Sequence, residues 1–437
     1  MTTQYRNAAT TECAGGVPEG NLILADGISF SRDTLATGVN NNVLIIGTSG
    51  SGKTRSVISP NILQASGSYI VSDPKGTLKR KYGHYLKRKG YKVLTLDLMN
   101  PAWSTHYNPM AHLQTDEDIV RFAHMLTYLE DSMEGEKRLD PFWDQSSQML
   151  LTALTGYLVN HCQPADRTIH SLNKILTLSC INEDNPDRET VLDRMFKDAV
   201  SDSDQRDSLT SRCYQFFRQA PGRTARSILI TLSAKISSLD TGELQRMMCR
   251  NDIDFTLLGR EKTALFLTVS DSDRSRDVLG DIIVTQCMQS LMSYADKNCV
   301  GQRLPVPVTF ILDDFATNVK IPDFPKIIST IRSRGISTML SLQNEGQLTN
   351  LYGAEGTTVI GNSDTILYLG GNDVDTARDI AVRADQPVTD ILNMGVGENW
   401  IFRKGQAPVH GRNFRLEPFE RAKLKEVGIE MEDERGL

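Results

Sequence analysis

The feature that most constrains this sequence is the octapeptide 47–54, GTSGSGKT, which satisfies the pattern GxxxxGK[ST]. Glycines let backbone N–H groups wrap around a phosphate, and the N-terminus of a helix favours its negative charge. Lys53 is predicted to reach the β- and γ-phosphates of a nucleotide, and Thr54 to ligate Mg²⁺ through its hydroxyl. The predicted phosphate loop comprises Gly47, Thr48, Ser49, Gly50, Ser51, Gly52, Lys53 and Thr54.

The surroundings of this loop support that interpretation over a glycine-rich turn with an incidental lysine. An apolar run at 43–46 precedes the loop and a helical stretch follows it, which is the context that such a loop needs. Pro60 comes soon afterwards and is expected to end or kink the helix.

Short apolar runs in two parts of the chain predict one buried sheet. The runs are bounded by Gly, Asn or Asp and separated by helix-length stretches, a rhythm typical of parallel strands. Between about 114 and 250 this rhythm gives way to helical spacing, at 116–130, 142–160 and 224–239. Strands are expected at 43–46, 68–72, 92–97, 263–269, 307–312, 336–342 and 364–369. We therefore predict an α/β fold whose mostly parallel sheet is interrupted by an all-α insertion.

The predicted domain plan follows from this pattern. Hairpins are expected at 21–30, around Asp26-Gly27, and at 398–403 with 408–414. The plan comprises a polar N-terminal segment at 1–20, a nucleotide-binding domain from 21–113 and 251–420, an all-α domain at 114–250 and an acidic tail at 421–437.

Composition excludes several classes of protein. Among 437 residues, 39% are hydrophobic and 23% charged, which is a globular balance. The net charge of −6 excludes a wholly basic nucleic-acid coat but permits a local basic groove. Seven scattered cysteines without CxxC indicate reduced thiols, and the histidines show no spacing typical of a transition-metal centre. No apolar run approaches the ~18 residues that span a bilayer, so a soluble chain is expected.

A second group of polar residues completes the predicted nucleotide site. The apolar run Phe310–Leu312 ends in Asp313 and Asp314. Asp313 is predicted to hold Mg²⁺ through water, and Asp314 to orient or deprotonate the attacking water. A plain turn at the end of a strand is the alternative, which the phosphate loop makes less favourable.

Several ordered motifs resemble the VirD4/TraG family of type IV secretion coupling proteins, over about residues 40–415. Besides the phosphate loop they are Ser72–Gly76 (SDPKG), Ser104–Pro109 (STHYNP), Asp140–Trp143 (DPFW), Leu312–Ala316 (LDDFA) and Ser341–Gln343 (SLQ) with Gln347-Leu348. The resemblance implies a RecA-like P-loop NTPase domain with an inserted all-α domain, an ATPase that uses ATP and Mg²⁺, and assembly as a hexameric ring.

The resemblance also implies roles for individual residues. Gln343 is expected to sense the γ-phosphate, and Arg332 matches the family's arginine finger, which acts on the nucleotide of a neighbouring subunit. Arg334 is a close rival, and either arginine is alternatively a solvated cation at a helix end. Asp73 and Lys75 follow a strand, at the end where α/β proteins bind ligands. Their place near the nucleotide is implied by the family, with a turn cap as the alternative.

The expected function is an ATP-driven coupling protein that recruits a relaxase–DNA substrate and drives its transfer into a conjugation channel. The implied partners are relaxosome proteins, the transferred DNA, channel components and further copies of the chain. Alternatives are a soluble DNA translocase of the FtsK/HerA type and a nucleotide-gated adaptor with little hydrolysis. The chain departs from the family in having Asp314 where Glu is usual, and in lacking N-terminal membrane helices. We expect a cytoplasmic protein, peripheral at the bacterial inner membrane through a separate anchor protein, unless an N-terminal segment lies outside this chain.

Two further features allow structural interpretations. The densest basic run, at 75–92, is interleaved with Tyr82, Tyr85 and Tyr91. It is interpreted as a solvated helix face whose tyrosines turn to the core, with a DNA path as the alternative. Phe142 and Trp143 are predicted to anchor the helical core. The acidic end is interpreted as a solubilising terminus, or alternatively as a docking tail for a relaxase.

Overall fold

The computed structural model describes residues 17–128, 141–179, 188–199, 208–270 and 273–430, and within this range the chain divides into two compact units. The first comprises the described residues within Met1–Thr95, Phe255–Asp271 and Cys287–Leu437, and the second those within Leu96–Asp254 and Ser272–Gln286. The second unit therefore begins before the predicted boundary at 114 and includes a later segment. Its early part is tied in by backbone bonds, such as that from the Asp252 N–H to the His106 carbonyl.

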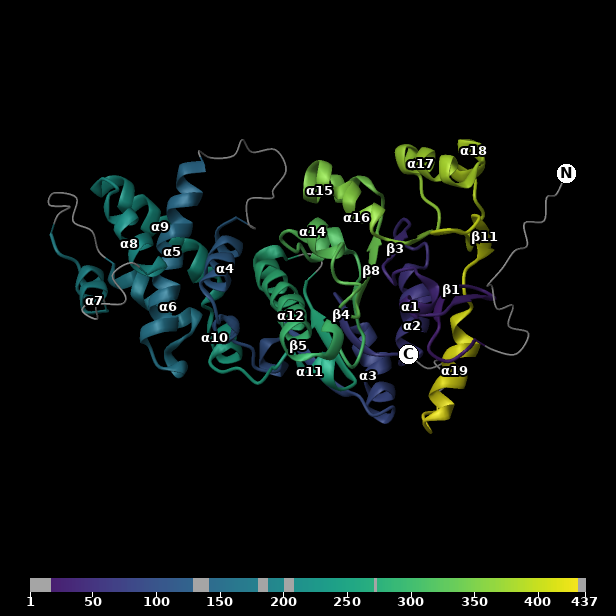
Figure 1. Ribbon diagram of the computed structural model, residues 1–437, viewed down its shortest axis with the longest axis horizontal. Coiled ribbons are helices and arrows are strands. Elements are labelled where there is room, and N and C mark those ends of the chain that lie inside the picture. The colour runs from purple at the N-terminus through teal and green to yellow at the C-terminus, as the bar shows by residue number, and fades with distance from the viewer. Residues whose placement is uncertain (1–16, 129–140, 180–187, 200–207, 271–272, 431–437) are drawn as a thin grey trace. The chain divides into compact units, whose positions relative to one another are not determined.

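A nine-stranded sheet in the order β11-β10-β9-β3-β8-β7-β4-β6-β5 forms the framework of the first unit (Figure 1). The strands are β3 (Val43–Ile46), β4 (Ser68–Ser72), β5 (Lys92–Asp97), β6 (Thr263–Thr268), β7 (Val308–Leu312), β8 (Ile336–Leu342), β9 (Thr365–Tyr368), β10 (Glu398–Arg403) and β11 (Val409–Arg412). From β9 through β3, β8, β7 and β4 to β6 the neighbours pair in parallel, whereas β10 pairs antiparallel with β9 and β11. The predicted α/β class, with a mostly parallel sheet and a helical interruption, is confirmed.

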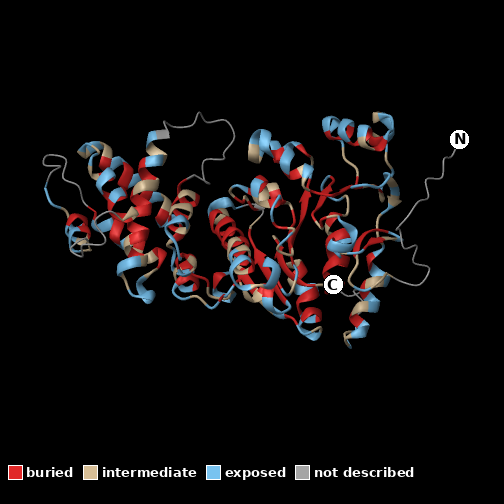
Figure 2. Ribbon diagram, in the orientation of Figure 1, coloured by how far each residue is buried: buried red, intermediate tan, exposed pale blue. Residues whose placement is uncertain are grey.

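Burial explains why these sequences form central strands. Every residue of β3, β4, β6, β7, β8 and β9 is buried, and the middle of the sheet appears red in Figure 2. Parallel strands covered on both faces need such continuous apolar runs. β10 instead alternates between half-buried and buried residues, as expected for a strand nearer the sheet edge. Both predicted hairpins are present: β1 (Leu22–Ala25) pairs with β2 (Ile28–Phe30), and β10 pairs with β11.

Helices connect most successive strands of the sheet along the chain. Tyr82 and Tyr85 of α3 are buried against the core that includes Val43 and Ile45 of β3, while the cations of α3 are mostly exposed. The tyrosines of the basic run therefore pack inward, as predicted, and are not available to stack on bases. The helices of the first unit are α1 (Thr34–Thr37), α2 (Ser59–Leu63), α3 (Thr77–Arg88), α11 (Leu257–Arg260), α12 (Asp277–Asn298), α13 (Phe315–Asn318), α14 (Phe324–Ile328), α15 (Gly346–Tyr352), α16 (Gly356–Gly361), α17 (Val374–Ala384), α18 (Val388–Leu392) and α19 (Leu416–Glu426). The part of α12 up to Gln286 belongs to the second unit.

The second unit is mainly helical. Its core includes Leu150, Leu154 and Leu158 of α5, which are buried at helical spacing. Phe142 is exposed and Trp143 only half-buried, so the prediction that both anchor this core was wrong: they lie in the first turn of α5, before its buried stretch. Asp140 of the same motif lies outside the described residues. The main helices are α4 (Asp116–Tyr128), α5 (Pro141–His161), α6 (Ile169–Leu178), α7 (Val191–Ala199), α8 (Leu209–Arg218), α9 (Gly222–Leu239) and α10 (Gly242–Met248).

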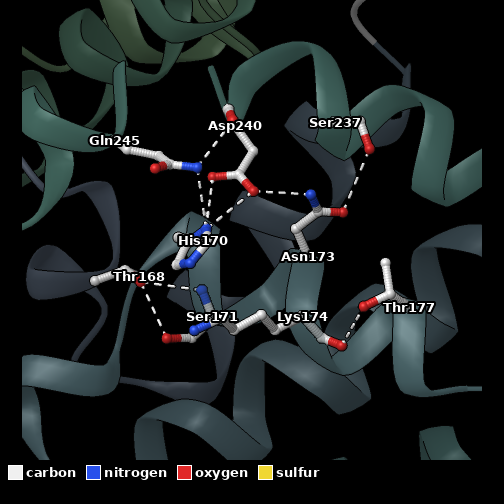
Figure 3. Close-up of polar contacts among 9 residues, drawn as sticks. All are labelled: Thr168, His170, Ser171, Asn173, Lys174, Thr177, Ser237, Asp240 and Gln245. Carbon is white, nitrogen blue, oxygen red and sulfur yellow. Dashed lines mark hydrogen bonds and ion pairs between the residues drawn. The ribbon is translucent and has the colours of Figure 1, made fainter. Parts of the chain in front are cut away.

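A polar cluster joins three of these helices (Figure 3). The buried Asp240 carboxylate accepts a bond of 2.8 Å from Asn173 Nδ2 and lies 3.1 Å from His170 Nδ1, and both partners are on α6. From α10, Gln245 donates to the Asp240 carbonyl. Asp240 is the residue directly after α9. The cluster therefore links the end of α9 to α6 and α10, which is a structural role.

Candidate nucleotide site

The phosphate loop leaves the carboxyl end of β3 and is held by two neighbouring strands. The Gly47 N–H donates to the carbonyl of Leu342 at the end of β8, and the Thr48 N–H donates to the carbonyl of Gly370, shortly after β9. Gly52 has a φ of +96°, in the left-handed region where a side chain would be strained. The neighbouring strands therefore fix the position of the loop, and the backbone conformation of Gly52 contributes to its curvature.

The helix after the loop changes form on the way to Pro60. Residues Lys53–Ile58 form a π-helical turn, in which the Ser59 N–H donates to the Thr54 carbonyl five residues earlier. From Ser59 the helix continues as α2 with Pro60 in its first turn, where a missing N–H costs little. Pro60 therefore marks a change of helical form rather than the end of the helix.

Lys53 is buried across the mouth of the loop. Its ammonium donates to the Gly47 carbonyl at 2.7 Å and to the Thr48 carbonyl at 3.2 Å, and it lies 3.9 Å from Asp314 Oδ1. Backbone carbonyls are neutral acceptors, so phosphate oxygens would be stronger partners for this cation.

Thr54 and Asp313 meet as the predicted magnesium site requires. The Thr54 hydroxyl donates to Asp313 Oδ2 at 2.5 Å, although the residues are 259 positions apart in sequence. The other carboxylate oxygen of Asp313 accepts a hydrogen bond from the Ser341 hydroxyl. A hydroxyl and a carboxylate, completed by phosphate oxygens and water, form the oxygen donor set that Mg²⁺ prefers.

Asp314 is held in an unusual backbone conformation beside this pair. Its φ is +47° and its ψ +49°, a left-handed geometry that Asp tolerates better than most residues. The Asp314 N–H donates to Ser341 Oγ at 2.9 Å, and its side chain is about 44% exposed. The carboxylate is thus accessible to water and close to Lys53.

One orphaned atom in the loop indicates that a ligand fits there. The Ser51 hydroxyl is buried without a hydrogen-bond partner among the described residues, and burial of such a group costs free energy unless it is paired. The Lys53 ammonium donates its two hydrogen bonds to neutral carbonyls and has one distant carboxylate, Asp314, at 3.9 Å. Together with this lysine, the orphaned hydroxyl indicates that the donor set of the loop suits a phosphate group. The residues present therefore fit a bound nucleotide with Mg²⁺.

The remaining predicted residues lie at different distances from this centre. Gln343 is exposed directly after β8, and its N–H donates to Gln347 Oε1 at 2.8 Å. Arg332 lies before the amino end of β8, at the opposite end of the strand from the phosphate loop, and Nη2 donates to the Thr34 carbonyl at 2.9 Å. Arg334 pairs with Asp296 through two contacts of 2.8 Å.

Asp73 and Lys75 follow β4, which is separated from β3 by β7 and β8. The Asp73 carboxylate is buried and accepts the Lys79 N–H at 2.9 Å, so it acts as the turn cap at the start of α3. Burial raises the pKa of this carboxyl above its usual range. Lys75 is exposed. Their place beside a nucleotide stays a prediction.

Two residues at the site were not singled out from the sequence. Ser341 bridges the two aspartates, and its inclusion in the motif SLQ was the available signal. Asn413 follows β11 and donates from Nδ2 to the Ser51 carbonyl at 3.2 Å. No local pattern marks Asn413, because 362 positions separate it from its partner in the loop.

The fold and this arrangement define a P-loop nucleotide-binding protein. The family described as type IV secretory system conjugative DNA transfer matches residues 3–384, and the chain belongs to it. Within the described residues, no helix combines the length and apolar character needed to cross a membrane.

Individual relatives are distant in sequence. The type IV secretion system-coupling protein VirD4 of Bartonella henselae is 22% identical over 401 residues, which are 88% of this chain but only 58% of that relative. The plasmid coupling protein TrwB with the ATP analogue ADPNP has a TM-score of 0.64 at 15% identity, covering 90% of this chain and 88% of that one. TrwB with ADP and Mg²⁺ gives 0.62 at 14%, covering 91% of each. These structures share the fold.

Proposed function

We propose that this chain is a Mg²⁺-dependent ATPase of the coupling-protein type, which drives a relaxase–DNA substrate into a conjugation channel. The observation that carries the proposal is the convergence of Lys53, Thr54, Asp313 and Asp314 at the carboxyl ends of β3 and β7. Complexes of TrwB with ADPNP and with ADP and Mg²⁺ support the choice of ATP and magnesium.

In the proposed mechanism, Lys53 exchanges its two carbonyl partners for oxygens of the β- and γ-phosphates. Thr54 and Asp313 hold the metal ion, which when bound neutralises charge on those phosphates. Asp314 accepts a hydrogen bond from water and orients it towards the γ-phosphate. The Asp314 side chain is one methylene shorter than that of Glu. The position of its carboxylate relative to the attacking water therefore depends more closely on the backbone, which is left-handed at this residue. Gln343, which is exposed after β8, senses the γ-phosphate.

Arg332 acts in trans in this proposal. The seven residues of β8 rise by about 20 Å between the arginine end and the nucleotide end of the strand, so Arg332 cannot reach the nucleotide of its own subunit. A ring, expected to be a hexamer, would bring the arginine to a neighbour's γ-phosphate and make turnover depend on assembly. Arg334 is the weaker candidate because Asp296 already neutralises it.

The proposed partners follow from the family. They are relaxosome proteins, the transferred DNA and components of the secretion channel. We place the protein in the cytoplasm, peripheral at the inner face of the membrane through such partners. The basic face of α3 is a candidate for local contact with DNA phosphates.

The test is steady-state ATP hydrolysis without DNA, with single-stranded DNA and with duplex, alongside mass from light scattering. Lys53→Ala should abolish turnover. Arg332→Ala should reduce turnover only in the assembled state, whereas Arg334→Ala, its matched control, should change it little. Unchanged hydrolysis in the Lys53 variant would contradict the site. Tight ATP binding without turnover, even with DNA and membrane partners, would favour the nucleotide-gated adaptor instead.

A further inference from the structure

A cavity of about 90 Å³ lies at the amino ends of β7 and β8, in the first unit. Its lining includes Pro307 before β7 and Gly335-Ile336 at the start of β8. The phosphate loop contacts the other end of β8, about 20 Å away by the rise of seven strand residues. The cavity is therefore a separate place from the nucleotide site of the same chain.

Three arginines line this cavity, and the hydrogen bonds that their guanidinium groups form within the described part of the chain go to neutral groups. Arg303 donates to the Thr34 hydroxyl at 3.3 Å, and Arg332 to the Thr34 carbonyl at 2.9 Å. Arg32 donates to the side-chain oxygen of Asn61 at 2.9 Å. Among the described residues, no carboxylate lies within ion-pair distance of any of the three guanidinium groups.

One carboxylate does act on the cluster electrostatically. Asp33 interacts with Arg303, but its oxygen accepts the N–H groups of Leu35 and Ala36 at 2.9 and 3.1 Å at the start of α1. Those backbone bonds, more than the arginine, hold the pKa of Asp33 below its usual range. Asp33 thus offsets one of three cations at most, and the cavity keeps a positive excess.

Two buried atoms of the lining residues are unpartnered within the described structure. They are Arg32 Nε, a donor, and Asn41 Oδ1, an acceptor. The amide orientation of Asn41 is set by its nitrogen, which donates to the Arg32 carbonyl at 2.7 Å. Burial also lowers the pKa of Arg32, as expected for a cation removed from water without an anion beside it. Buried charges in proteins are normally paired.

We propose that this cavity binds one hydrogenphosphate ion. In the unassembled subunit, where Arg332 faces no neighbouring nucleotide, the oxygens of the ion accept from Arg32, Arg303 and Arg332. Guanidinium geometry suits tetrahedral oxyanions. The O–H group of the ion donates to Asn41 Oδ1, the acceptor that lacks a donor. The volume is several times the ~15 Å³ that a single water needs, so a small tetrahedral ion fits. Sulfate has the same shape but carries no proton at neutral pH, and it leaves Asn41 unpaired.

This inference goes beyond the proposed ATPase and is testable without it. In the Lys53→Ala protein, whose phosphate loop is disabled, inorganic phosphate should raise the unfolding temperature saturably at constant ionic strength. Sulfate should act at least tenfold more weakly, and chloride should have no saturable effect. The same phosphate titration of the wild-type protein, with ADP and Mg²⁺ bound in the loop, is the control in case the Lys53→Ala variant does not fold.

Matched variants in the Lys53→Ala background show which residues bind the phosphate that raises the unfolding temperature. Arg303→Gln should weaken phosphate binding at least tenfold, and Arg303→Lys less. Arg334→Gln, which removes the same charge from a neighbouring arginine outside the cavity lining, should leave phosphate binding unchanged. Asn41→Ala should remove the preference for phosphate over sulfate. Equal responses to phosphate and sulfate, or a phosphate response that survives Arg303→Gln, would overturn the proposal. Absence of ATP hydrolysis by the wild-type protein, with phosphate binding intact, would instead refute only the proposed function.

Discussion

Removal of the Ser341 hydroxyl should lower ATP turnover much more than ATP binding. This hydroxyl donates to Asp313 and accepts the Asp314 N–H at 2.9 Å, so a single buried atom positions both aspartates. A hydrogen bond to a charged group contributes about 1.5–3 kcal/mol. If that free energy is lost in the transition state, Ser341→Ala lowers kcat about 10- to 150-fold. Lys53 keeps its place in the loop, so KM for ATP should change little.

The assay is steady-state hydrolysis across ATP concentrations, with DNA and light-scattering mass held constant between variants. Ser341→Thr keeps a hydroxyl and should retain more activity than Ser341→Ala. Ser363→Ala, which removes another buried hydroxyl bonded to a helix carbonyl, controls for general destabilisation. A kcat within twofold of wild type in Ser341→Ala would refute the reasoning, as would an equal loss in the Ser363 variant.

Two further predictions concern the helical unit. Burial lowers the pKa of His112 from 6.5 to about 4. The unfolded chain therefore binds more protons at this residue, and the stability of the folded protein falls as the pH drops below 6.5. Urea unfolding should show a free energy of unfolding about 2 kcal/mol lower at pH 5 than at pH 7, a difference that His112→Asn should lack. A pH dependence identical in both proteins would argue against this assignment. In α5, a Cβ added at Gly156 would lie 2.3 Å from the Thr210 hydroxyl of α8. Gly156→Ala should therefore destabilise the protein by about 1–3 kcal/mol, measured by thermal unfolding. An unchanged stability would indicate that the two helices can separate to make room for the added methyl group.

The predictions from sequence succeeded where the controlling interactions are local. Runs such as 43–46 and 336–342 became β3 and β8 with the predicted bounds, because continuous apolar residues can be satisfied only inside a covered sheet. The phosphate loop was equally predictable from the sequence, since its glycines, lysine and threonine are contiguous. The interpretation of Phe142 and Trp143 failed because apolar character alone does not say which turn of a helix faces its neighbours.

Local sequence thus determined the strands, the loop and the pair of acidic residues that completes the candidate site. Only the tertiary structure decided that Ser341 bridges Asp313 and Asp314, and that Asn413 supports the loop. It also gathered Arg32, Arg303 and Arg332 around one cavity. These contacts join residues tens to hundreds of positions apart, and those of Ser341 exist because β8 and β7 are neighbours in the sheet. Strand order is set by long-range pairing and by the packing of the covering helices, neither of which a local pattern encodes.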